Sequence, residues 1–161
     1  MESLYPIYSA IGEASLIVYF FALIVVVHRY RLINSTIICI GLVFMMQSLM
    51  RLMREPLMEF GSREVWYGSW TIFYVLTAYM LYKTHDVLKV NLAQLTNRVA
   101  FTFCIGACIH TARYIDRQHF GGAYLDTFYP LAINTINVSL AAMVMITVAK
   151  DKKEKLVGLY V

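Results

Sequence analysis

The stretch SAIGEASLIVYFFALIVVV, residues 9–27, is followed directly by the basic sequence HRYR, residues 28–31. Within residues 9–27 the only charged side chain is Glu13. A bilayer core of about 30 Å requires roughly 20 helical residues, so this stretch is long enough to cross a membrane. The sequence therefore predicts a transmembrane helix over residues 9–27 that ends at a basic membrane surface.

The composition of the whole chain supports the same class of protein. Of the 161 residues, 60% are hydrophobic and only 15% are charged, and the mean hydropathy is +0.61. Soluble domains are usually about 45–50% apolar and about 25% charged. A soluble chain of this size would have too small an interior to bury the excess. We therefore predict an all-α integral membrane protein with a single transmembrane helical domain, residues 1–161.

Five segments of the chain are apolar enough, or nearly so, to span the membrane. Pro56 and Gly61 are expected to end the second segment, and the aromatic residues 66–70 suit an interfacial belt at the start of the third. The fourth segment is the weakest because it contains His110 and Arg113. The expected spans, which form a compact bundle, are residues 9–27, 33–53, 65–82, 99–115 and 127–149.

The distribution of basic residues predicts the orientation of this bundle. With the N-terminus outside, nine of the 14 Lys and Arg residues fall on the inner side and five on the outer side. Short cytoplasmic loops carry the excess of Lys and Arg, so the C-terminus is predicted to be cytoplasmic. The first ten residues contain no basic residue, which is unlike a cleavable signal peptide. We expect a multi-pass protein of the cytoplasmic (inner) membrane.

Polar side chains recur at helical spacing in the outer half of four of the five segments. A central Arg disfavours membrane insertion by about 2.5–3.5 kcal/mol, so these side chains should face the interior of the bundle. Glu13 is the expected counter-ion of Arg51 or Arg113. The members of this predicted polar layer are Glu13, Gln47, Arg51, Arg54, His110, Arg113, Arg117, Asn134 and Asn137.

The polar layer has two competing interpretations. It is either a network of ion pairs and hydrogen bonds that fixes the packing of the helices, or a water-accessible pocket that opens to the outside. Intramembrane ionisable residues are candidates for function. Such a pocket would handle an anion, a lipid headgroup or a proton.

No enzyme motif, metal site or cofactor site is expected. The chain has no GxSxG, Walker or HExxH pattern, and its basic residues form no continuous stripe for nucleic acid. Two chemical alternatives stay open: a b-type haem between His28 and His85, and a lipid-acting enzyme with His110 as its base. The cysteines Cys39, Cys104 and Cys108 are expected to be unpaired packing residues.

The architecture indicates a protein that alters membrane permeability or moves a small solute, as a homo-oligomer: a channel, a transporter or a holin-like pore. Small residues at Ala100, Cys104, Cys108 and Ala112 form a ridge for close helix packing, within one chain or between copies. The alternative is a non-catalytic anchoring, assembly or sensor subunit of a larger membrane complex. Its protein partner would bind the basic tail, residues 150–155, or the charged outer loop, residues 54–64.

Overall fold

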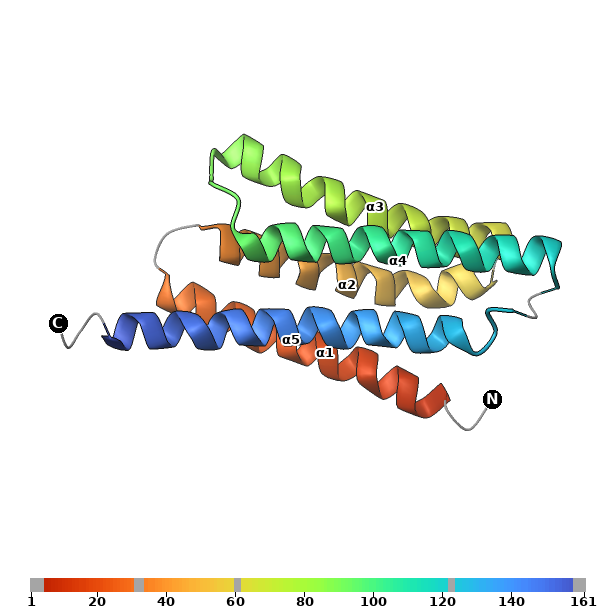
Figure 1. Ribbon diagram of the computed structural model, residues 1–161, viewed down its shortest axis with the longest axis horizontal. Helices are drawn as coiled ribbons and strands as arrows, with labels where there is room; N and C mark the ends of the chain where they lie inside the picture. Colours follow the sequence, from red (N-terminus) through yellow and green to blue (C-terminus); the bar gives the residue numbers. More distant parts are fainter. Residues whose placement is uncertain (1–4, 31–33, 60–61, 122–123, 158–161) are drawn as a thin grey trace.

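The computed structural model contains five α-helices joined by short connections (Figure 1). It describes residues 5–30, 34–59, 62–121 and 124–157, with side chains for residues 10–30, 34–59, 62, 64–121 and 124–150. No strand occurs in these described ranges. The helices are α1 (Tyr5–Arg29), α2 (Ser35–Glu59), α3 (Arg63–Leu88), α4 (Gln94–His119) and α5 (Phe128–Val157).

The five helices lie along one long axis and alternate in direction. α3 and α4 form one side of the bundle, α1 and α5 form the other, and α2 contacts α1, α3 and α4 (Figure 1). α1 begins at one end of the axis and α5 ends at the opposite end. The predicted all-helical class is confirmed, and each predicted span lies within, or begins within two residues of, one helix.

Three of these helices are long and apolar enough to cross a membrane. Among the described residues these are Ala10–Arg29, Ser35–Glu59 and Phe128–Lys150, which correspond to the first, second and fifth predicted spans. α3 and α4 are 26 residues each, but their hydropathy is lower. α3 contains four Tyr and three Thr residues, and α4 carries several charged and amide side chains.

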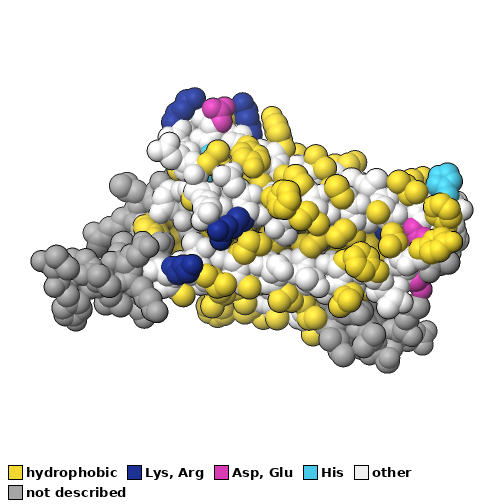
Figure 2. Space-filling view, in the orientation of Figure 1, with side chains coloured by type: hydrophobic (Ala, Val, Ile, Leu, Met, Phe, Trp, Pro, Cys, Tyr) yellow, Lys and Arg dark blue, Asp and Glu magenta, His cyan; other side chains and the backbone are white. Residues whose placement is uncertain are grey.

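The outer surface of the bundle is strongly apolar. Hydrophobic side chains cover the middle of the face in Figure 2, whereas Lys and Arg side chains gather toward the end where α5 finishes. Soluble monomers rarely expose large contiguous apolar patches. This surface and the three apolar helices are the features of a membrane protein. Large exposed apolar side chains occur on every helix, for example Phe21, Leu52, Ile72, Phe101 and Leu131.

The prediction that Pro56 ends the second segment is wrong, because α2 continues to Glu59. Proline has no N–H to donate to the carbonyl four residues earlier. Pro56 is in the last turn of α2 and is exposed, so only one hydrogen bond near the end of the helix is lost. The polar side chains of this final turn lowered the hydropathy of the segment, and its helical continuation was therefore missed.

A core of apolar side chains fills the middle of the bundle. Val43, Phe103, Leu140 and Val144 are completely buried, and they come from α2, α4 and α5. α3 approaches α4 at Gly106, where an added Cβ atom would lie 2.0 Å from the Tyr74 ring. Glycine at this position therefore allows the Tyr74 ring to lie directly against the backbone of α4.

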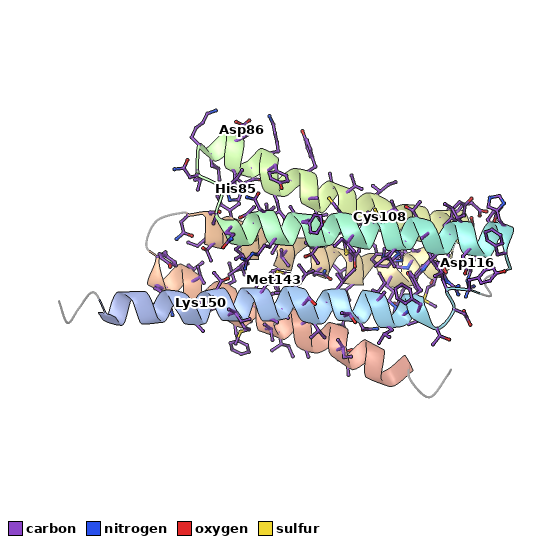
Figure 3. The ribbon with its side chains drawn as sticks, in the orientation of Figure 1. His85, Asp86, Cys108, Asp116, Met143 and Lys150 are labelled. Carbon is purple, nitrogen blue, oxygen red and sulfur yellow. The ribbon has the colours of Figure 1, made fainter. Side chains whose placement is uncertain are left out.

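A group of buried polar side chains connects the helices at the end of the bundle where α2 and α4 begin. Ser35 lies 2.7 Å from Nε2 of His85 and 3.0 Å from the Thr96 hydroxyl, and it accepts a 2.9 Å hydrogen bond from the Ala93 N–H. Nδ1 of His85 lies 2.6 Å from the Leu81 carbonyl, to which it donates. Figure 3 shows His85 at this end. We call Ser35, His85 and Thr96 the polar clamp, since they join α2, α3 and α4.

Candidate functional site

The candidate site is a partly open cavity in the half of the bundle away from the polar clamp. Its volume is about 260 Å³, and all five helices contribute to its wall. α1 supplies only small and aliphatic contacts, and the other helices supply the polar and aromatic ones. The lining residues are Gly12, Leu16, Gln47, Met50, Arg51, Arg54, Trp66, Trp70, Tyr74, His110, Tyr129, Ile133, Asn134 and Asn137.

Most of the predicted polar layer meets at this cavity. Glu13 is not in the wall but lies beside it, with its carboxylate 2.7 Å from the Arg51 guanidinium. Arg113 and Arg117 lie outside the wall, closer to the end of α4. The predicted residues that line the cavity are Gln47, Arg51, Arg54, His110, Asn134 and Asn137.

The ion pair between Glu13 and Arg51 is one of the two pairings expected from the sequence. Both side chains are about half exposed, at 52% and 49%. The pair joins α1 to α2 beside the cavity and places the Arg51 guanidinium at its wall.

His110 is the most enclosed polar residue of the wall, with 3% of its surface exposed. Its Nδ1 atom lies 2.9 Å from the Tyr129 hydroxyl. Its ring stacks on Trp70 at a centroid distance of 6.3 Å and an interplanar angle of 21°, and it also contacts the Tyr74 ring at 5.0 Å. Aromatic contacts from α3 and α5 thus fix the orientation of His110 between them.

Three buried polar atoms of the cavity wall lack hydrogen-bond partners among the described residues. They are Nε2 of Gln47, the indole Nε1 of Trp70 and Nε2 of His110. Buried polar atoms are nearly always hydrogen-bonded to protein or water. The three residues come from three different helices, and all of them line the cavity.

Arg113 and Arg117 belong to a separate ion-pair cluster at the end of α4. Arg113 is 2% exposed and donates to Asp116 at 2.7 Å and to Asp126. Arg117 lies 3.4 Å from Asp126. Asp116 also accepts hydrogen bonds from the backbone N–H groups of residues 124 and 125. This cluster fastens the connection between α4 and α5, and Figure 3 shows Asp116 at this end of the bundle.

The members of the polar layer therefore fall into two groups. Arg113 and Arg117 form a structural ion-pair network, whereas the other members gather at the cavity. Sequence reasoning missed the partners of Arg113. The spacing of Arg113 and Asp116, three residues apart on one helix, is a signal that would have found the first of them.

Sequence reasoning also missed the aromatic part of the wall. Trp66 and Trp70, which suit an interfacial belt, also line the cavity. Tyr67 is buried, and its ring packs on the ring of Tyr129 at 5.8 Å. Trp66 and Trp70 are four residues apart and so share one face of a helix, which is the signal for a common wall.

The two histidines considered for a haem, His28 and His85, are not arranged to hold one. Both ring nitrogens of His85 are engaged in the polar clamp, while His28 is exposed at the end of α1, so a haem between them is not supported. Cys104 and Cys108 lie on the exposed face of α4, whereas His110 is buried. The small-residue ridge does not pack within the chain at Cys104, Cys108 and Ala112, which are all exposed.

The functional interpretation therefore rests on the geometry of the site. The chain matches no family model, no curated protein and no solved structure. At the site, cationic and aromatic side chains surround a space within the bundle.

Proposed function

We propose that this chain is a five-span membrane protein, with its N-terminus outside and its C-terminus in the cytoplasm, that moves a small solute as a homo-oligomer. The cavity is the outward-facing site for that solute. The observation that carries this proposal is the convergence of all five helices on one cavity with unpaired buried polar atoms.

The surface of α3 and α4 supports membrane insertion of these two helices. Their outer faces carry exposed apolar side chains, including Ile72 and Val75 on α3 and Phe101 and Ile105 on α4. Their most polar side chains, His110 and Arg113, are buried in the bundle. Apolar side chains facing lipid and ionisable ones facing inward are the arrangement expected of membrane-spanning helices.

The apolar core favours a transporter rather than a pore that stays open through one protomer. Beyond the cavity, the apolar side chains of Val43, Phe103 and Leu140 are completely buried. Passage of a solute would thus require a rearrangement of the helices or a route between copies. The exposed Cys104 and Cys108 of α4 supply a surface of small residues on which a second copy could pack closely.

The first prediction concerns topology. In a variant without the native cysteines, single cysteines at Glu59 and His119 should react with an impermeant maleimide in intact cells. Cysteines at Asn91 and Lys150 should react only after the membrane is permeabilised, because alternating helices put these positions at the opposite end of the bundle. Labelling of Lys150→Cys in intact cells would contradict five spans with a cytoplasmic C-terminus.

The second prediction concerns solute movement. Purified protein in liposomes should take up at least one class of small solute (inorganic ions, amino acids, sugars or carboxylates) faster than protein-free liposomes. His110→Phe should reduce this uptake about tenfold, because it removes the polar ring atoms from the cavity wall. The matched control is His119→Phe, at an exposed position outside the wall, which should leave uptake unchanged.

The anchoring alternative predicts a different result. Folded protein would then move no solute, and a second protein would co-purify with it in stoichiometric amount. The tail beyond Lys150, where such a partner was expected to bind, lies outside the side chains that the structure describes. A holin-like pore would instead collapse the membrane potential when expression is induced.

A further inference from the structure

The geometry points to a binding site for an anionic phospholipid in the groove between α4 and α5, at the end of the bundle where α4 begins and α5 ends. This site goes beyond the proposed function: it rests on the membrane insertion of α4 that we propose above, but not on solute movement. Three features carry it: the charge balance at this end of the bundle, two cations that converge on the groove, and the apolar surface beside them.

The end of the bundle where α4 begins is rich in cations and poor in acids. Asp86 of α3 is the only acid among the described side chains at this end, and Lys83 and Lys89 both pair with it. The adjoining sequence, residues 31–33 and 151–161, adds four Lys or Arg and two Asp or Glu, so the excess of cations persists. This excess favours an anionic partner. The described cations at this end are Arg29, Lys83, Lys89, Arg98 and Lys150.

Arg98 lies at the edge of α4 that borders α5. α4 contacts α3 on one side and α5 on the other. Thr111 marks the α3 side, because its hydroxyl lies 3.4 Å from the Thr71 hydroxyl of α3. Arg98 and Thr111 point about 140° apart around the helix. The exposed Arg98 is therefore at the opposite edge of α4, next to α5.

Lys150 lies at the matching edge of α5. α1 contacts the other side of this helix, where Arg29 donates a 2.9 Å hydrogen bond to the Val148 carbonyl. Lys150 and Val148 point about 160° apart, so the exposed Lys150 is turned away from α1 and toward α4. Figure 3 shows Lys150 toward the end of α5.

The two cations converge on the groove between the helices. A side chain on a helix leans toward the N-terminus of that helix. Arg98 therefore leans toward the start of α4, and Lys150, on the antiparallel α5, leans back toward Arg98. Neither forms an ion pair with another described side chain. Two cations that share a groove repel each other, so an anion between them stabilises both.

The groove next to the cations is apolar, which favours a phospholipid over a small soluble anion. Ile105 lies two turns after Arg98 on the same stripe of α4, and Ile146 lies one turn before Lys150 on α5. These isoleucines are 41% and 54% exposed. Hydrophobic side chains cover this part of the face in Figure 2. A phosphate held by the two cations would have its acyl chains along this apolar surface, as in lipid sites between membrane helices.

The experiment places a tryptophan in the groove by Ile105→Trp, in a chain whose own tryptophans are replaced by Trp66→Phe and Trp70→Phe. The protein is reconstituted in phosphatidylcholine bilayers with increasing fractions of brominated phosphatidylglycerol or brominated phosphatidylcholine. Bromine on an acyl chain quenches only a tryptophan close to it. Phosphatidylglycerol should bind beside the reporter at least about fivefold more strongly than phosphatidylcholine, because one Lys or Arg near the headgroup contributes about this factor.

Variants of the reporter chain test the assigned cation. Arg98→Gln should lower the preference for phosphatidylglycerol about fivefold, and Arg98→Lys should retain it. The matched control is Lys83→Gln, which removes a cation that pairs with Asp86 on α3 and should leave the preference unchanged. A second reporter, Ile72→Trp on the exposed surface of α3, should be quenched equally by the two lipids.

A second measurement uses the chain with its native tryptophans, so it does not depend on the folding of the reporter chain. Native mass spectrometry from micelles that contain both lipids should show phosphatidylglycerol retained by the protein in preference to phosphatidylcholine. Arg98→Gln should lose this preference, and Lys83→Gln should keep it.

Several results would overturn the site. They are equal binding of the two lipids at Ile105→Trp, an unchanged preference in Arg98→Gln, and the same preference at Ile72→Trp, which would indicate general attraction to a positive surface. Relief of quenching by glycerol phosphate, a headgroup without acyl chains, would assign the cations to a soluble anion instead.

Two further results separate this site from the proposed function. Absence of quenching of Ile105→Trp by either brominated lipid would show that this face of α4 does not contact acyl chains, which contradicts the five-span proposal together with the site. A preference for phosphatidylglycerol in a protein that moves no solute would support the lipid site and reject solute movement.

Discussion

Replacing Arg113 with Met should lower the free energy of unfolding of the bundle by about 3–5 kcal/mol. Arg113 is 2% exposed, and it pairs with the buried Asp116 and with Asp126. Without the guanidinium, the buried Asp116 would lose the cation that pairs with it, and Asp126 would keep only the more distant Arg117. The loss can be measured as a shift in the thermal or denaturant unfolding transition of purified protein in detergent, followed by circular dichroism.

The neighbouring Arg117 provides the matched control. It reaches the same Asp126 but at 3.4 Å, and 39% of its side chain is exposed, so Arg117→Gln should change stability by less than about 1 kcal/mol. Replacing Arg113 and Asp116 together with Met and Asn should recover most of the loss, since both buried charges are then removed and Asp126 keeps its pair with Arg117. Equal effects of Arg113→Met and Arg117→Gln would contradict the buried ion-pair cluster.

Gly106→Ala should destabilise the bundle by about 1–3 kcal/mol, the usual range for overpacking a close contact. The added methyl would lie 2.0 Å from the Tyr74 ring, so the almost fully buried ring would have to shift. Tyr74 lines the cavity, so the substitution should also change the tryptophan emission spectrum. The unfolding transition and the emission maximum of the purified variant measure the two effects.

Gly68→Ala is the control for the helical propensity of alanine. Gly68 lies within α3, and an added Cβ atom there would meet nothing within 4 Å. This substitution should be neutral or stabilise by up to about 1 kcal/mol, because alanine is the better helix former. The double variant Gly106→Ala, Tyr74→Leu should recover part of the stability lost in Gly106→Ala. A loss in Gly68→Ala as large as that in Gly106→Ala would contradict the steric explanation.

The hydropathy pattern predicted the number and approximate positions of the helices. Residues 9–27 lie within α1 because a long apolar run without breaks has few alternatives to a helix in lipid. The ends of the helices were less predictable. Polar turns continue each helix without raising its hydropathy, as in the last turn of α2 around Pro56. Membrane crossing by α3 and α4 remains a prediction, because polar residues lower the hydropathy of both helices.

Part of the site could be predicted from helical spacing. Gln47, Arg51 and Arg54 share one face of α2, and the cost of exposing them to lipid indicated that this face points inward. Helical spacing gives the face of a side chain but not its height relative to a neighbouring helix. The choice of Arg51 as the partner of Glu13, and the return of Asp126 to Arg113 through the connection after α4, both depend on such heights.

The aromatic part of the cavity wall was not predicted from the sequence, for a different reason. Tryptophan and tyrosine have an apolar ring and a polar atom, which suit the membrane interface and a polar cavity equally well. The sequence position of Trp66 and Trp70 at the start of α3 favoured the interface. The contact of Trp70 with His110 of α4, and that of Tyr67 with Tyr129 of α5, become visible only in the folded bundle.

The ion pair within α4 bears on how the chain is assembled during synthesis. Arg113 and Asp116 lie three residues apart on one helix, so their charges can neutralise each other as soon as that helical turn forms, before the ribosome has made α5. The translocon would then meet a fourth segment whose most costly charge is already paired. Asp126 arrives with the next segment and completes the cluster. The order of synthesis thus matches the order in which the partners of Arg113 are needed.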